Sequence, residues 1–205
     1  MHNNIVKLIG QVISAPVFSH SSYEDNYYIF NLSVNRLSQT SDIVPIIITS
    51  KKFDPATINS EDKVSIYGDY RSFNFHSEDT THLSLNVFAK KIDFCDSKDT
   101  PDSNEVFLNG YLCKPPIFRK TPLNRTVCDV LLAVNRPNRK SDYIPCIVWG
   151  KNAELCKDLV TGTNLTIKGR IQSRSYQKKT ETSYSEKTAY EVSVSFIEVL
   201  DKKPE

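Results

Sequence analysis

Residues 32–51 read LSVNRLSQTSDIVPIIITSK and residues 132–151 read LAVNRPNRKSDYIPCIVWGK, so the chain repeats itself at a shift of one hundred residues. The same shift, without a gap, aligns further identical residues: Asn4 with Asn104, Val6 with Val106, Leu8 with Leu108, Gly10 with Gly110, Pro16 with Pro116 and Phe18 with Phe118. A period of this length is too long for a solenoid repeat and matches a whole domain. The sequence therefore predicts two copies of one module in tandem.

The length of 205 residues suffices for two small domains, each with one hydrophobic core. We expect the first domain over residues 1–95 and the second over residues 104–200. Residues 96–103, DSKDTPDS, are polar and mostly acidic, which is typical of a linker. Residues 201–205 would form a short tail.

The charge differs between the two copies. Residues 1–94 hold eight Lys and Arg against ten Asp and Glu, whereas residues 104–200 hold fifteen against nine. A basic module beside an acidic one is expected of a protein that binds a polyanion through one domain. Charge alone is equally consistent with a solvated basic surface.

Signals for catalysis, metal binding and membrane insertion are weak. No paired carboxylate, glycine-rich phosphate loop or activated nucleophile stands beside any histidine, and no stretch approaches the roughly 18 apolar residues of a membrane span. The cysteines are odd in number and form no C-x-x-C pair: Cys95, Cys113, Cys128, Cys146 and Cys156. We therefore expect free thiols and a cytoplasmic, non-enzymatic protein without a cofactor or metal.

Each copy shows five stretches with the apolar patterning of strands. In the second copy the third stretch ends at Trp149, a helical pattern follows over residues 151–160, and a fourth strand contains Gly169. The first copy has a poorer helical pattern at this place because Pro55 interrupts it. Five strands with a helix between the third and fourth predict the Greek-key barrel called the OB-fold, an all-β fold whose face binds oligonucleotides or oligosaccharides.

Aromatic residues of the second copy alternate with cations. Tyr143 and Trp149 share one face of the third strand, opposite the apolar Ile144 and Val148. Tyr176 ends the fourth strand, on the face that also carries Arg170, Gln172 and Arg174. Proteins that bind single-stranded nucleic acid stack bases on such rings while cations follow the phosphates. The alternative is that the rings belong to the core and the cations to a solvated face.

The second copy resembles the DNA-binding domain of bacterial single-stranded DNA-binding proteins, because ordered blocks match along almost its whole length. They are NEVFLNG at 104–110, PIFR at 116–119, LAVNR at 132–136, DYIPCIVWGKNAE at 142–154, GRIQSRSY at 169–176 and YEV at 190–192. The resemblance implies that Tyr143, Trp149 and Tyr176 stack on bases, with Phe75 as the first copy's counterpart of Tyr176. It also implies phosphate contacts by Arg119 and Arg174.

Charge and placement add further candidates for phosphate binding to the two that the resemblance implies. They are Arg136, Arg139, Lys140, Lys151, Arg170, Lys178 and Lys179. The first copy has Ile43 and Thr49 where the second has Tyr143 and Trp149, although it carries other aromatics such as Tyr27. Because it is also net acidic, we expect it to serve assembly rather than DNA binding.

The sequence thus favours a protein of two OB-folds that binds single-stranded DNA with little sequence preference, in replication, recombination or repair. Since the family commonly assembles four barrels, we expect a homodimer. A rival interpretation is a protein-binding adaptor in replication restart or plasmid transfer, supported by the divergent first copy. RNA or oligosaccharide binding is allowed by the fold, and stacking alone does not separate RNA from DNA.

Overall fold

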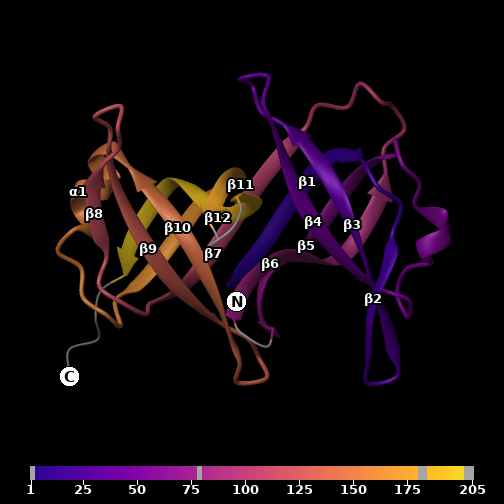
Figure 1. The fold of residues 1–205 in the computed structure, drawn as a ribbon, viewed down its shortest axis with the longest axis horizontal. Helices are drawn as coiled ribbons and strands as arrows, with labels where there is room; N and C mark the ends of the chain where they lie inside the picture. Colours follow the sequence, from indigo (N-terminus) through magenta and orange to yellow (C-terminus); the bar gives the residue numbers. More distant parts are fainter. Residues whose placement is uncertain (1–2, 78–79, 180–183, 201–205) are drawn as a thin grey trace.

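The computed structural model describes residues 3–77, 80–179 and 184–200 and shows two β-barrels side by side (Figure 1). The first barrel is formed by β1 (Asn4–Val12), β2 (Val17–Ser22), β3 (Asp25–Asn35), β4 (Ser41–Thr49), β5 (Lys63–Ser77) and β6 (Thr80–Phe94). The second is formed by β7 (Ser103–Leu112), β8 (Ile117–Lys120), β9 (Thr126–Asn135), β10 (Ser141–Trp149), β11 (Asn164–Lys179) and β12 (Tyr184–Leu200). The prediction of tandem OB-folds is confirmed.

Two details differ from the prediction. Each barrel contains one short strand beyond the five predicted, β2 or β8, whose mostly exposed residues show no apolar alternation. The helix between the third and fourth predicted strands is the helix α1 (Gly150–Cys156) in the second barrel, but only a 3₁₀ turn (Pro55–Thr57) in the first. The Asp54 cap and a proline in the first position begin this turn, and it ends at Thr57 because Ile58 is extended.

Each barrel closes at a glycine in its first strand. Strand β1 pairs with β5 along most of its length and turns at Gly10, after which Gln11 and Val12 pair with β3. A Cβ atom on Gly10 would overlap the carbonyl oxygen of Ser33. Gly110 stands in the same relation to Ala133, so the bend requires glycine in both copies.

The buried apolar residues of both barrels form one continuous cluster. It is made of inward-facing residues from alternate strand positions, such as Leu8 and Leu32 in the first barrel and Leu108 and Leu132 in the second. The cluster extends through the junction, so the two barrels bury one common core.

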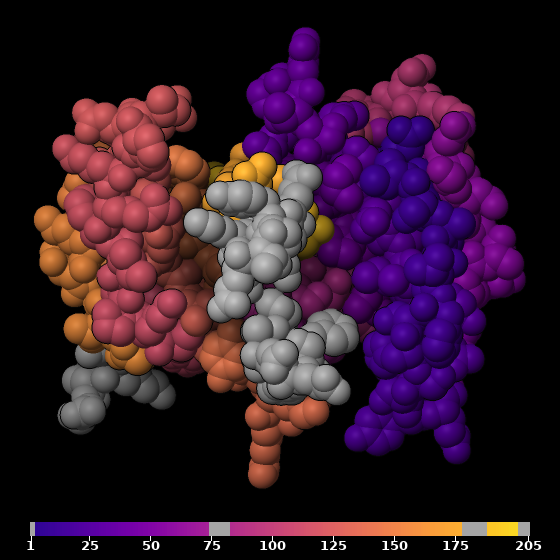
Figure 2. All heavy atoms as spheres, in the orientation of Figure 1, coloured from indigo at the N-terminus to yellow at the C-terminus, as the bar shows by residue number. Residues whose placement is uncertain are grey.

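Strands β1 and β7 pair antiparallel at the junction and join both barrels into a sheet of twelve strands. The register relates equivalent residues: Asn4 faces Leu108, Val6 faces Val106 and Leu8 faces Asn104. This symmetry means that a pseudo-two-fold axis passes between Val6 and Val106. The equivalent β3–β4 and β9–β10 loops accordingly project from opposite ends of the junction (Figures 1 and 2).

The segment 95–102 connects β6 to β7 and is tied to the first barrel at its end. The carboxylate of Asp102 forms an ion pair with Lys63 and accepts a 2.6 Å hydrogen bond from the backbone N–H of Asn35. The connection is therefore anchored where it meets β7. The domain limits themselves stay a prediction from the sequence.

Candidate nucleic-acid interface

The outer face of β10 carries aromatic side chains, as its alternation predicts. Tyr143 is 45% exposed and Trp149 is half-buried, whereas Ile144, Cys146 and Val148 point into the core. The indole Nε1–H of Trp149 donates a 3.1 Å hydrogen bond to Oγ of Ser193 on the neighbouring strand β12. This bond fixes the orientation of the ring while leaving part of it at the surface.

The exposed part of β11 continues this surface. Tyr176 is 40% exposed, and Arg174 on the same face is also exposed. Gln172 lies further back on that face and donates a 3.1 Å hydrogen bond to the carboxylate of Glu191. Phe75 in β5 and Lys178 and Lys179 in β11 lie in stretches whose side chains fall outside the described residues.

The predicted phosphate-binding cations fall into two groups. Four of them extend from the surface and form no ion pair in the described part of the chain: Arg139, Lys140, Lys151 and Arg174. Arg119 is exposed but forms a bidentate pair with Asp129. Its pKa is raised because it hydrogen-bonds this carboxylate.

The guanidinium groups of Arg136 and Arg170 have carboxylate partners at the junction between the barrels. Arg136 binds Asp142, and Arg170 binds Asp42 on the other barrel with a 3.1 Å contact. Burial lowers the pKa of Arg170, and repulsion from Arg36 lowers it further. We therefore do not assign phosphate contacts to these two arginines in the proposal below.

Asp42 forms the centre of a buried polar cluster across the junction. It accepts a bidentate interaction from Arg36 of its own barrel, with the Nε contact at 2.7 Å, and a 2.8 Å hydrogen bond from the backbone N–H of Ser173 of the other barrel. Ser173 Oγ in turn accepts from the backbone N–H of Ile43 at 3.1 Å. We call this cluster the first clasp.

The second clasp repeats these contacts with the barrels exchanged. Asp142 binds Arg136 of its own barrel, accepts a 2.7 Å hydrogen bond from the backbone N–H of Ser72 and contacts Arg71 at 3.3 Å. Ser72 Oγ accepts from the backbone N–H of Tyr143 at 2.8 Å. Both aspartates are fully buried.

The clasps place the hairpin of each barrel beside the face of the other. The part of β5 beyond Ser72 reaches the start of β10, where the Arg136 guanidinium lies 5.6 Å from the ring centre of Phe73. The part of β11 beyond Ser173 reaches the start of β4. Tyr143 thus lies next to the β5–β6 hairpin of the first barrel. Tyr176 belongs to the β11–β12 hairpin, which contacts β4 of the first barrel.

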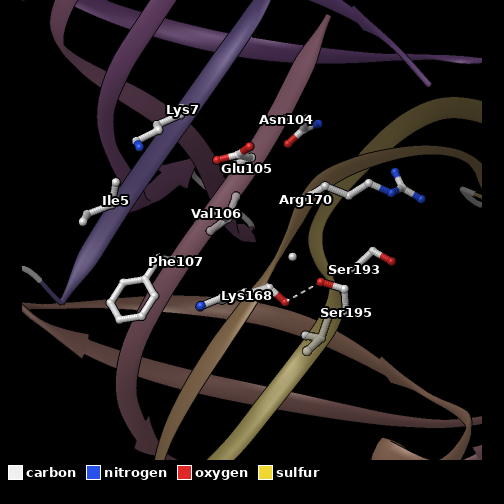
Figure 3. A pocket seen from close by; sticks show the side chains of 12 residues that line it. Ile5, Lys7, Asn104, Glu105, Val106, Phe107, Lys168, Arg170, Ser193 and Ser195 are labelled. Carbon is white, nitrogen blue, oxygen red and sulfur yellow. Dashed lines mark hydrogen bonds between the residues drawn. The ribbon is translucent and has the colours of Figure 1, made fainter. Parts of the chain in front are cut away.

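A hollow of about 560 Å³ opens elsewhere on the junction, over β1, β7, β11 and β12 (Figure 3). Its lining carries charges of both signs, from Lys7, Lys168, Arg170 and Glu105, and a single aromatic ring, Phe107. It lacks the succession of rings on the face of β10, and we assign no ligand to it.

The cysteines lie in or beside the strands and helix of the second barrel, except Cys95. Burial raises the pKa of Cys113, Cys128 and Cys146, and raises that of Cys156 to about 12. Among the described residues no cluster of His, Cys, Asp or Glu has the arrangement of a metal site. Within the same ranges, no helix is both long and apolar enough to span a bilayer.

The fold and this surface define a class: OB-fold proteins with two fused barrels and partly exposed aromatic rings beside cations. Residues 103–200 match the family described as the single-strand binding protein family. A relative in Halalkalibacterium halodurans, named single-stranded DNA-binding protein, is 42% identical over 80 residues, which make up 36% of this chain and 48% of the relative. Single-stranded DNA-binding protein 2 of Chlorobaculum tepidum is 32% identical over 113 residues, or 50% of this chain and 74% of the relative.

The chain belongs to the single-strand binding protein family. It spans about half the length of several of the curated relatives it matches. In fold it is similar to the wild-type single-stranded DNA binding protein from Thermus aquaticus, with a TM-score of 0.78, 18% identity, and coverage of 98% of this chain and 95% of that one. This likeness extends over both barrels.

Proposed function

We propose that the chain binds single-stranded DNA, mainly through the second barrel and with little sequence preference. Bases stack on Tyr143, Trp149 and Tyr176, and each stacked base contributes about 1–3 kcal/mol. The single observation that carries the proposal is the partly exposed row of rings on the outer face of β10, which continues to Tyr176. The names of the relatives support the same ligand.

The cations around this face that pair with no described carboxylate neutralise the phosphates. Arg139 and Lys140 lie in the β9–β10 loop, next to Tyr143, and Lys151 follows Trp149 directly. Arg174 lies two residues before Tyr176. Since each phosphate contact releases counterions, the affinity falls steeply with salt concentration. A cytoplasmic role in replication, recombination or repair, without catalysis, is part of this proposal.

Trp149 is the only tryptophan of the chain, so its fluorescence reports on the proposed site directly. Titration with oligo(dT) should quench it in a saturable manner, and quenching should require more oligonucleotide as salt is raised. Absence of both quenching and a mobility shift at low salt would contradict the proposal and favour the adaptor function.

We include a homodimer in the proposal, because two chains would present four barrels. Light scattering of the free protein measures the molar mass. A value of twice the chain mass is expected, and a value of one chain mass would contradict this part alone.

A further inference from the structure

The first barrel carries an aromatic ring one strand away from the position of Trp149. In the second barrel Trp149 on β10 faces Val127 on β9. In the first barrel the equivalent pair is Thr49 on β4 and Tyr27 on β3. The large ring and the small side chain have thus exchanged strands, so both barrels place one aromatic ring at the same point of their outer face.

Tyr27 is the centre of an aromatic cluster in the first barrel. His20 on β2 stacks on it with ring centres 4.6 Å apart and an angle of 8° between the planes. Phe88 on β6 lies 6.4 Å away on the other side. Phe88 pairs with Ile47 as Ser193 pairs with Ile147, so it occupies the position of the serine that binds Trp149.

The cluster is accessible at the surface. His20 is exposed, and Tyr27 and Phe88 are half-buried, as Trp149 is. His20 covers one face of Tyr27 and is itself exposed, so the stacked pair offers a ring on which a base can stack.

One carboxylate of the first barrel, Asp25, lies on the same face of β3 as Tyr27 and accepts hydrogen bonds from Ser50 Oγ and the backbone N–H of Lys51. Other positions of this face are less acidic than in the second barrel. Ile29 and Asn86 replace two carboxylates of the second barrel's face, Asp129 and Glu191, at equivalent strand positions. Asp69, which does lie beside Phe88, is buried and paired with two cations of its own barrel, Arg71 and Lys90. The net negative charge of the first barrel therefore overstates the repulsion that a phosphate would meet on this face.

The second barrel supplies cations to the same face. Ser173 is fixed against Ile43 and Asp42 by the first clasp, so the next residues of β11 continue beside the start of β4. These residues include the exposed Arg174 and Tyr176. At the opposite end of β4 the exposed Lys51 donates a 3.3 Å hydrogen bond from Nζ to the carbonyl oxygen of Tyr23. Cations thus stand at both ends of a strand that spans about 20 Å from Ile43 to Thr49.

We propose that the first barrel holds a second site for single-stranded DNA, in which an unpaired base stacks on the His20–Tyr27 pair and the strand continues toward Arg174 and Tyr176 of the second barrel. This inference rests on the proposed function of the second barrel. It assigns binding, rather than assembly alone, to the divergent copy. The ligand class that fits this face best is an unpaired polynucleotide, because the stacked rings are apolar and cations lie at both ends of β4.

The variant Tyr27→Val tests this site with a side chain that the second barrel already accommodates at the same position, Val127. The matched control is Tyr23→Asn, which removes a tyrosine of the same hairpin at its 95% exposed tip and suits the positive φ of 50° at this position. Circular dichroism and thermal unfolding verify that both variants fold. Tyr27→Phe, which keeps the ring, should bind as the unmodified chain does.

Two measurements separate this proposal from the proposed function. In the Trp149→Ala background, Tyr27→Val should weaken the remaining affinity for oligo(dT) about 5- to 150-fold, the equivalent of one stacked base at roughly 1–3 kcal/mol. With Trp149 intact, Tyr27→Val should leave its quenching in place but reduce the number of nucleotides occluded per chain on poly(dT).

Unchanged affinity and unchanged occlusion in Tyr27→Val, with Trp149 still quenched, would overturn the second site and keep the proposed function. If the unmodified chain shows neither quenching of Trp149 nor a mobility shift with oligo(dT) at low salt, the proposed function itself is wrong. Photocrosslinking of 5-iodouracil-substituted oligo(dT), mapped by mass spectrometry, gives a direct readout: a crosslink in the peptide containing Tyr27 is expected, and crosslinks confined to the second barrel would contradict the site.

Discussion

The two barrels are alike at the junction and different on their outer faces. Asp42 and Asp142, with the arginine of the same barrel that binds each of them, Arg36 or Arg136, are identical in the two copies and form equivalent clasps. The faces differ at Ile43 and Tyr143, and at Thr49 and Trp149. At these positions, the residues that join the two barrels are identical in the two copies, and the residues on the outer faces differ.

The loops beside the clasps show the same contrast. Residues 37–40, LSQT, and residues 137–140, PNRK, connect equivalent strands. Gln39 and Arg139 both have positive φ, of 64° and 63°, so the turns share one backbone shape. The side chains differ, and Arg139 and Lys140 give the second loop the two cations that Gln39 and Thr40 do not carry. The chain thus offers matched positions at which one property can be exchanged between barrels.

The largest effect is expected at the clasps. Asp142→Ala should lower the free energy of unfolding by about 3–5 kcal/mol, because it leaves Arg136 and the backbone N–H of Ser72 without their buried acceptor. Asp42→Ala should cost a similar amount if the two clasps are energetically equivalent. Urea unfolding followed by circular dichroism measures both.

The control for the clasps is Asp93→Ala, which removes an exposed carboxylate paired with Lys91. Such a pair contributes about 0–1 kcal/mol, so the unfolding midpoint should hardly move. If Asp42→Ala and Asp142→Ala behave like this control, the clasps do not hold the barrels together. A large difference between the two would show that one barrel depends more on the junction.

The strand order and the β10 alternation could be predicted from the sequence, because each depends on local patterns and on the repeat. The short strands β2 and β8 could not, since their mostly exposed residues show no alternation. The clasps were missed because they depend on which strand ends meet across the junction. Asp142 in an otherwise apolar strand, with an identical Asp42, was the available signal.

The roles of two arginines and of Tyr27 were beyond the sequence for related reasons. Charge and placement put Arg136 and Arg170 among the phosphate-binding candidates, and a sequence does not reveal that each is paired with a buried carboxylate. Tyr27 aligns with Val127, so position-by-position comparison did not connect it with Trp149. Only cross-strand pairing shows that the two rings occupy the same point.

A moderate effect is expected from removing the ring of Trp149. Trp149→Ala should weaken binding of oligo(dT) by about 1–3 kcal/mol, because the largest stacking surface of the second barrel is lost. Thr49→Ala at the equivalent position should have no comparable effect, since Thr49 is 9% exposed and offers no ring. Fluorescence anisotropy of labelled oligo(dT) measures both affinities. A folded Trp149→Ala variant with unchanged affinity would refute stacking on Trp149.

The smallest effect is expected from exchanging the loops. Arg139→Gln with Lys140→Thr gives the β9–β10 loop the residues of the first barrel at these positions, and the turn should keep its shape because Gln39 has the same φ. If both cations contact phosphates, the slope of log K against log salt should fall in magnitude by about 0.7 per contact.

Affinities measured across a salt series give this slope. Lys91→Gln is the matched control, because Lys91 is exposed and paired with Asp93, and its slope should equal that of the unmodified chain. The reverse exchange, Gln39→Arg with Thr40→Lys, then decides whether the strand passes the first barrel's loop as well: a steeper slope means that phosphates come within reach of the new cations. An unchanged slope in both exchanges would place the strand away from these loops and limit the phosphate contacts to Lys151 and the β11–β12 hairpin.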